Sequence, residues 1–331
     1  MSSRFAQFDP NRLTLHPLSA RQHDLDLSVI KSLRPMPHTL DGLDQVADRL
    51  VRAKRKGASI VLMMGAHVLR AGVQRYLIDW MEKGLLSAIA LNGAGVIHDY
   101  EFARIGATTE SVAHYIRDGR FGMWQETGEI NDIVREAHQR QEGIGEAVGR
   151  VIAEGDFKHA DISMLAHAWR LGVPVTVHVG IGYDIIHPHA NFDGAAWGAT
   201  SHRDFLRFAH VLENLENGVV MNLGSAVMGP EVYLKALSMV RNVAQAENRQ
   251  IAHFTTLVCD LRDLPSNVTQ GEAVKQNPSY YYRPWKTMLV RTVADGGESF
   301  YVRGDHAHTV PQLWSLVNTR YQSDNTEESR P

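Results

Sequence analysis

The chain has 331 residues, with 34 lysines and arginines against 37 aspartates and glutamates and a formal net charge of −3. No basic block accompanies this near-balance, so nucleic acid is not an expected partner. The only cysteine, Cys259, excludes a disulfide within the chain, and no apolar run reaches the roughly 18 residues that cross a bilayer. We therefore expect a cytoplasmic protein that has no membrane segment.

The two ends of the chain differ in composition from the part between them. Four prolines within residues 1–40 predict an extended arm that packs over the domain or over a neighbouring subunit. The polar residues 322–331 predict a disordered tail. The remaining segment, residues 41–321, shows no linker or shift in composition and is expected to form one domain.

Apolar runs of strand length alternate with stretches of helical periodicity along this domain. The expected strands are 59–64, 86–91, 174–179, 218–223, 250–258, 287–293 and 299–303. The expected helices are 39–56, 69–84, 109–118, 126–148, 160–171, 201–215, 231–246 and 310–321. This alternation predicts a single α/β, Rossmann-like domain with a central, mainly parallel sheet flanked by helices.

Small residues follow several of the expected strands. The loops are Gly65-Ala66-His67, Asn92-Gly93-Ala94-Gly95 and Gly224-Ser225-Ala226. At the carboxyl ends of parallel strands, such residues let backbone N–H groups approach a phosphate or ribose. The spacing is not GxGxxG, so the glycines serve a tight turn equally well. Asp260 and Asp305, also at strand ends, fit either ribose hydroxyls or local turns and caps.

Histidines are numerous, 17 in all, and several fall in the loops expected at one edge of the sheet. Three imidazoles, or two with a carboxylate, suit Zn²⁺, Fe²⁺ or Mn²⁺, although no HExxH spacing is present. The weak metal candidates are His98, His178, His187 and His189. Neutral imidazoles near a nucleotide also serve as acid/base groups without a metal. Both interpretations remain open at this point.

Five segments in order resemble the deoxyhypusine synthase family, including its bacterial deoxyhypusine synthase-like members. They are GAHVLRAGVQRYLIDWMEKGLLSAIALNGAGVIHD, HAWRLGVPVTVHVGIGYD, GVVMNLGSAVMGPEV, HFTTLVCD and RPWKTMLVR. The resemblance covers roughly residues 40–320. It implies an NAD-binding fold and a homotetramer whose active sites lie between subunits.

The resemblance also implies which residues contact NAD. These are His67, Gly72, Asn92, Gly93, Ala94, Gly224, Ser225, Thr255, Thr256, Asp260 and Asp305. For the chemistry, Lys286 aligns with the lysine on which the family holds a four-carbon amine as an imine, and Trp285 precedes it. Asp184 supplies charge for an amine, and His98, His178 and His187 are the candidates for moving protons.

Some positions depart from the family. Its catalytic histidine falls on Pro230, and the acids that hold the polyamine fall on His98, Gly182 and His187. Replacing carboxylates by imidazoles removes the charge that attracts a polyamine, which argues against spermidine-dependent modification of a translation factor. We therefore expect an NAD-dependent transferase or oxidoreductase acting on a small, polyamine-like amine, with Lys286 forming an imine. Two alternatives stay open: a metal-dependent hydrolase, and a catalytically inactive NAD-binding protein.

Overall fold

A computed structural model describes residues 4–37 and 39–328. Its centre is a six-stranded sheet in which every pairing is parallel. The strand order is β5-β3-β2-β6-β7-β8. The bounds are β2 (Ile60–Met64), β3 (Ala88–Asn92), β5 (Val175–His178), β6 (Val219–Leu223), β7 (Thr255–Asp260) and β8 (Glu298–Arg303). The expected α/β, Rossmann-like class is thereby confirmed.

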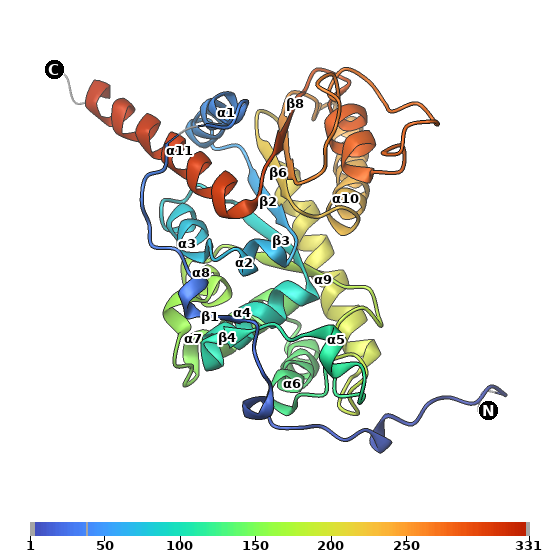
Figure 1. The fold of residues 1–331 in the computed structure, drawn as a ribbon. Helices are drawn as coiled ribbons and strands as arrows, with labels where there is room; N and C mark the ends of the chain where they lie inside the picture. The colour runs from blue at the N-terminus through green and yellow to red at the C-terminus, as the bar shows by residue number, and fades with distance from the viewer. Residues whose placement is uncertain (1–3, 38, 329–331) are drawn as a thin grey trace.

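Helices cover both faces of this sheet (Figure 1). They are α1 (Leu43–Arg55), α2 (His67–Arg70), α3 (Gln74–Glu82), α4 (Gly93–Ile105), α5 (Val112–Tyr115), α6 (Gln125–Gln139), α7 (Ile144–Glu154), α8 (Met164–Leu171), α9 (Gly194–Leu212), α10 (Met228–Ala246) and α11 (His306–Glu328). None of these described helices is long and apolar enough to cross a membrane.

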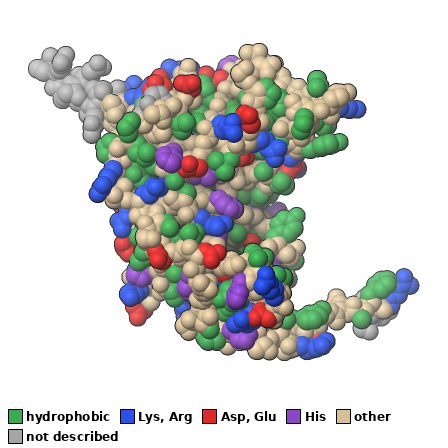
Figure 2. All heavy atoms as spheres, viewed as in Figure 1, with side chains coloured by type: hydrophobic (Ala, Val, Ile, Leu, Met, Phe, Trp, Pro, Cys, Tyr) green, Lys and Arg blue, Asp and Glu red, His purple; other side chains and the backbone are tan. Residues whose placement is uncertain are grey.

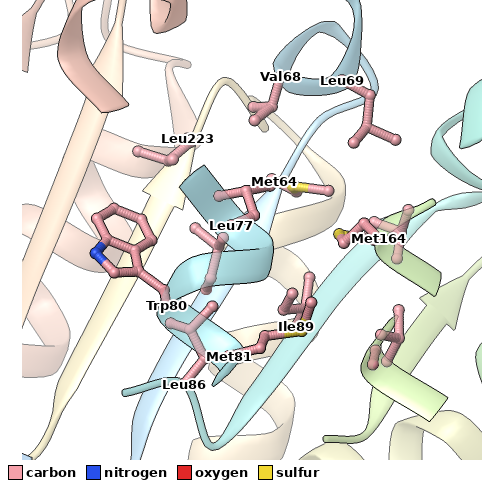
Figure 3. Close-up of a cluster of buried hydrophobic side chains, with 14 of the residues drawn as sticks. Met64, Val68, Leu69, Leu77, Trp80, Met81, Leu86, Ile89, Met164 and Leu223 are labelled. Carbon is pink, nitrogen blue, oxygen red and sulfur yellow. The ribbon is translucent and has the colours of Figure 1, made fainter. Parts of the chain in front are cut away.

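Alternate side chains of each strand enter two separate cores, because successive residues of a strand point to opposite faces. Leu62 and Met64 join the core formed with α1, α3, α8 and α11. Figure 3 shows part of this core, where Leu77, Trp80 and Met164 surround Met64. The intervening β2 residues join the other core, formed with α9 and α10. The strands whose ends carry the loops are therefore packed against helices on both faces of the sheet.

Three local expectations were wrong. Residues 287–293 are not a strand, because Trp285–Val290 form a π-helix, η5, packed on β7 and β8. Nearly all of its side chains are buried, so its apolar run has no polar face from which sequence periodicity reveals a helix. Strand β7 begins at Thr255 rather than at residue 250. Helix α4 replaces the loop expected after residue 92, and its long apolar surface is buried on several sides.

The ends of the chain lie against or beyond this body. Helix α11 runs on to Glu328, so the tail expected from 322 begins inside a helix, and residues 329–331 lie outside the described part. The N-terminal segment contains η1 (Pro10–Arg12), η2 (Leu18–Ala20), β1 (Leu25–Asp26) and η3 (Leu27–Val29). Strand β1 pairs antiparallel with β4 (Ala107–Thr108), while the described residues before η2 project away from the body (Figure 1).

Candidate functional site

The sheet reverses its winding direction at β2 and β6. From β2 the chain builds outward through β3 and β5, and it then returns to build β6, β7 and β8 on the other side. This is the 3-2-1-4-5-6 order of doubly wound sheets, in which ligands bind at the carboxyl ends of the two strands at the switch. Gly65 and Gly224 follow those two strands. A Cβ on Gly65 would lie 2.6 Å from the Gly224 carbonyl oxygen, so only glycine allows this close approach.

Several buried polar atoms around this switch point lack a hydrogen-bond partner within the described chain. They include Arg70 Nε on α2, Asn222 Oδ1 near the end of β6 and His306 Nδ1 at the start of α11. Buried polar groups are nearly always paired, so a group of unpaired ones at a strand switch point is a candidate set of contacts for a ligand. Arg70 also donates to His67 Nε2 at 3.1 Å, which places a guanidinium beside the loop after β2. The Arg70 guanidinium suits a phosphate, and Asn222 Oδ1 can accept from a ribose hydroxyl.

A pocket of about 180 Å³ lies over the start of α4, the helix that follows β3, and β3 is the strand next to β2. Its lining brings together two residues predicted for catalysis, His98 and Asp184, with two further carboxylates, Glu101 and Glu110. Arg21 of the N-terminal arm also reaches it. The sequence pattern had placed His98 and Asp184 on separate loops, and the fold brings both to one cavity.

Asp184 lies at the N-terminus of α4. Its carboxylate accepts a hydrogen bond from the Ala94 N–H and covers Gly93, where any Cβ would overlap the carboxylate. Asn92 caps the same helix by accepting from the Gly95 N–H at 3.2 Å. A carboxylate of the chain itself therefore occupies the position at which Asn92, Gly93 and Ala94 were expected to meet the cofactor. Burial raises the pKa of Asp184 to about 6, although the Ala94 hydrogen bond opposes this rise.

His187 stands behind Asp184. Its Nδ1 accepts from the backbone N–H groups of Gly182 and Asp184 at 3.0 and 3.3 Å, so its proton sits on Nε2. That nitrogen faces Asp184 Oδ2 at 3.6 Å and has no hydrogen-bond partner within the described residues. Burial lowers the pKa of His187 to about 4, so the ring is neutral at pH 7. His187 thus offers Asp184 an N–H without adding charge.

The other carboxylates of the pocket are already bonded. Glu101 forms a bidentate pair with Arg21 at 2.8 and 2.7 Å and also accepts from Thr108 and Thr127. Burial alone would raise the pKa of Glu101, but these partners outweigh it and hold the pKa below its usual range. Glu110 accepts from the Gly122 N–H and from the Trp124 indole, while burial raises its pKa.

Three residues expected to contact the cofactor lie elsewhere. Thr255 and Thr256 are at the amino end of β7, where they donate to Glu298 and to the Met288 carbonyl. At about 3.3 Å per residue, Asp260 is roughly 16 Å further along the strand, at the opposite edge of the sheet. Gly72 packs against the arm, because a Cβ there would overlap the Val29 carbonyl oxygen. A cofactor at the carboxyl edge does not explain these three residues.

The remaining residues that were expected to contact the cofactor lie at the carboxyl edge, and several of them already form hydrogen bonds within the protein. Ser225 accepts from the Gly229 N–H at 2.8 Å and so holds the start of α10. Asp260 accepts from the Tyr282 hydroxyl and from the Leu261 N–H. Asp305 is exposed and pairs with His308 Nδ1 at 2.8 Å. His67 and Gly224 flank the switch point itself.

Four predicted catalytic residues are not part of the pocket lining: His187, described above, and His178, Lys286 and Trp285. His178 is buried, contacts Thr176 Oγ1 at 3.0 Å and packs edge-on against Phe208 of α9. Lys286 is 6% exposed, and its ammonium lies 3.2 Å from the centre of the Tyr280 ring. Trp285 donates to the Gly271 carbonyl and so ties down the long loop before it. An imine at Lys286 stays a prediction.

The candidate metal ligands do not converge. His98 and His178 contact threonines, His187 faces Asp184, and His189 Nε2 contacts the Gly122 carbonyl at 2.7 Å. Across residues 4–37 and 39–321, whose side chains the structure describes, no group of three or more His, Cys, Asp or Glu side chains has the geometry of a metal site. Figure 2 shows histidines scattered over the visible face. The described side chains therefore do not favour a metal-dependent hydrolase.

The sequence did not point to Arg21, Thr108 or Glu110 as site residues, whereas Arg70 lies in the loop from His67 to Gly72 that was expected to contact NAD. Glu101 carried a usable signal, because it lies three residues after His98 and shares its face of a helix. No sequence pattern pointed to Arg21, because its contact with Glu101 joins residues 80 positions apart.

Comparison with known proteins gives similarity of fold only. No protein-family model and no curated protein matches the chain. Among solved structures, the ternary complex of AgrE with ornithine and NAD⁺ matches with a TM-score of 0.50 and 15% identity, over 85% of this chain and 33% of that one. The chain thus spans about a third of the length of AgrE.

Two other solved structures are similar at lower scores. A conserved LOR/SDH protein from Methanococcus maripaludis S2 matches with a TM-score of 0.49 and 16% identity, over 84% of this chain and 69% of that one. ArgZ, an arginine dihydrolase from the ornithine–ammonia cycle in cyanobacteria, matches at 0.46 and 15%, over 84% and 32%.

The resemblance to deoxyhypusine synthases is wrong. No family model matches the chain, and AgrE, which is not a deoxyhypusine synthase, is among the solved structures that share its fold. Three of the five segments contain a strand end followed by small residues, which any doubly wound sheet with a ligand edge requires. The expected tetramer and the polyamine substrate rested on that resemblance and stay without other support.

Proposed function

We propose that this protein is an NAD-dependent oxidoreductase that acts on a small amine. The observation that carries the proposal is the acidic pocket over the start of α4, because α4 follows the strand next to the switch point of the sheet. One crevice offers close backbone approach and unpaired polar atoms, and the adjoining cavity offers carboxylates. A dinucleotide and a cation are the ligands that these two surfaces complement.

The cofactor half is assigned to the loops after β2 and β6. Gly65 and Gly224 let the chain approach a pyrophosphate, Arg70 adds positive charge, and Asp305 is available to a ribose. A bound nicotinamide would accept a hydride from the carbon next to the substrate nitrogen. The acidic ribose partner usual after the second strand is absent, since Asn92 ends β3 and caps α4.

The substrate half is assigned to the 180 Å³ pocket. Asp184 is its titratable carboxylate, and above a pKa of about 6 it carries the charge that attracts an ammonium group. Glu101 is neutralised by Arg21, so Asp184 and Glu110 are the carboxylates left to meet a cation. AgrE, which shares the fold, forms a complex with ornithine and NAD⁺, and this supports ornithine and NAD⁺ as first probes.

Calorimetric titration with NAD⁺ tests the cofactor half. We expect saturable binding to the wild type and about tenfold weaker binding to Arg70→Gln, the effect of losing one charge-assisted hydrogen bond. Arg75→Gln is the matched control, because Arg75 lies one helix further on, is 45% exposed on its side chain and forms an exposed ion pair with Asp161 at 3.8 Å. No binding to the wild type, or equal loss in both variants, would contradict the assignment.

A further inference from the structure

A series of hydrogen bonds between side chains links the N-terminal arm to the pocket. Arg21 lies against Glu101, and both side chains are 1% exposed. Glu101 accepts from the Thr108 hydroxyl at 2.6 Å, and the Thr108 oxygen contacts His98 Nδ1 at 2.8 Å. The His98 ring lines the pocket.

The proton positions in this series of hydrogen bonds follow from chemistry. Glu101 is ionised beside Arg21, because its pKa lies below the usual range, and an ionised carboxylate only accepts. Thr108 has one hydroxyl proton, which it donates to Glu101. The Thr108 oxygen must therefore accept from His98, and this places the imidazole proton on Nδ1.

The other ring nitrogen is then a bare acceptor. Burial lowers the pKa of His98 to about 4, and Arg70, His67 and Arg21 nearby also disfavour a second proton, while Glu101 opposes them. At neutral pH the ring stays uncharged with a lone pair on Nε2. Such an atom accepts an N–H and offers no donor to a carboxylate or phosphate.

We propose that His98 Nε2 is a fixed acceptor for an N–H of the bound ligand, and that Arg21, Glu101 and Thr108 are positioning residues that hold this tautomer. With Asp184 in the same pocket, the ligand class is a cationic nitrogen that carries N–H groups, such as an ammonium or guanidinium. The ligand class rests on the proposed function, whereas the tautomer rests on the hydrogen bonds alone. The arm thereby becomes part of the site, through Arg21.

Nitrogen NMR of histidine side chains tests the tautomer directly. In ¹⁵N-histidine-labelled protein, the His98 signals are assigned by their loss in His98→Gln. We expect the wild type to show a protonated Nδ1 and an unprotonated Nε2 between about pH 6 and 8. Thr108→Ser keeps the hydroxyl and should keep this pattern, whereas Thr108→Val should give a mixture of tautomers.

The outcomes separate this proposal from the proposed function. A proton on Nε2 in the wild type, or an unchanged tautomer in Thr108→Val, would overturn the proposal that these hydrogen bonds hold the His98 tautomer. If Thr108→Val does not fold, the wild-type spectrum and Thr108→Ser still decide. Titration with ornithine in the presence of NAD⁺ should shift the Nε2 signal, and we expect about tenfold weaker binding to His98→Phe. If the tautomer is as predicted but NAD⁺ does not bind, the proposed hydrogen-bond series stands and the proposed redox function is refuted.

Discussion

Asp184 has two roles, and both require the ionised form of its carboxyl group. As the anion at the start of α4 it stabilises the helix through the Ala94 N–H, and as a pocket residue it offers charge to a ligand. Burial opposes both by raising its pKa to about 6. The charge of this residue therefore changes within the range in which most proteins are studied.

Amine binding should depend on this ionisation. A carboxylate with a raised pKa is neutral below that pKa, so ammonium affinity should rise as the pH passes upward through about 6 and then level off. The amine itself stays protonated until about pH 10. Calorimetry with ornithine at a series of pH values measures this dependence, and Asp184→Asn should bind about tenfold more weakly at pH 8.

The control for this prediction is the shape of the curve. Asp184→Asn keeps an acceptor for the Ala94 N–H but has no proton to lose, so its affinity should be flat across pH 6. A similar rise in the variant would assign the titration to another group and remove Asp184 from the amine site.

Among the elements, the N-terminal arm is held by backbone contact at one glycine. Gly72 has φ +75°, its carbonyl accepts from the Lys31 N–H at 2.8 Å, and its missing Cβ leaves room for the Val29 carbonyl. The arm also contains the strand β1 that pairs with β4, which contains Thr108. Displacing the arm at Gly72 should therefore disturb Arg21 as well.

Gly72→Ala tests this attachment against a matched control. Gly57 also has positive φ, +63°, but no atom lies within 4 Å of the position that a Cβ would take there. Both alanines incur the left-handed penalty of about 1 kcal/mol, and only Gly72→Ala adds the clash. Urea unfolding should show a clearly larger loss for Gly72→Ala, with faster proteolysis in residues 4–37. Equal losses of unfolding free energy in the two variants would mean that the arm can move away from Gly72 without further loss of stability.

The sequence predicted elements best where one face of the element is polar. Helix α1 has buried residues such as Leu43, Val46 and Leu50 on one side, and its periodicity was plain. The π-helix containing Thr287, Met288 and Leu289 is buried almost throughout, so β-branched and apolar residues there suggested a strand. Tertiary packing, which the local pattern does not contain, decided that segment.

At the scale of the molecule, the alternation of strands and helices was enough to predict the parallel sheet, but not its order. The order places β2 between β3 and β6 and so creates the crevice. The pocket depends on contacts such as Arg21 with Glu101, which no local pattern encodes. The short glycine motifs, by contrast, reflect what the fold needs, and they suggested the wrong family for that reason.

The most direct measurement is a crystal structure of the protein with NAD⁺. We predict the pyrophosphate over the loops at Gly65 and Gly224, with Arg70 in contact and the nicotinamide facing the pocket of His98 and Asp184. A nicotinamide placed away from that pocket, or a dinucleotide bound at the amino edge near Thr255, would contradict the proposed function.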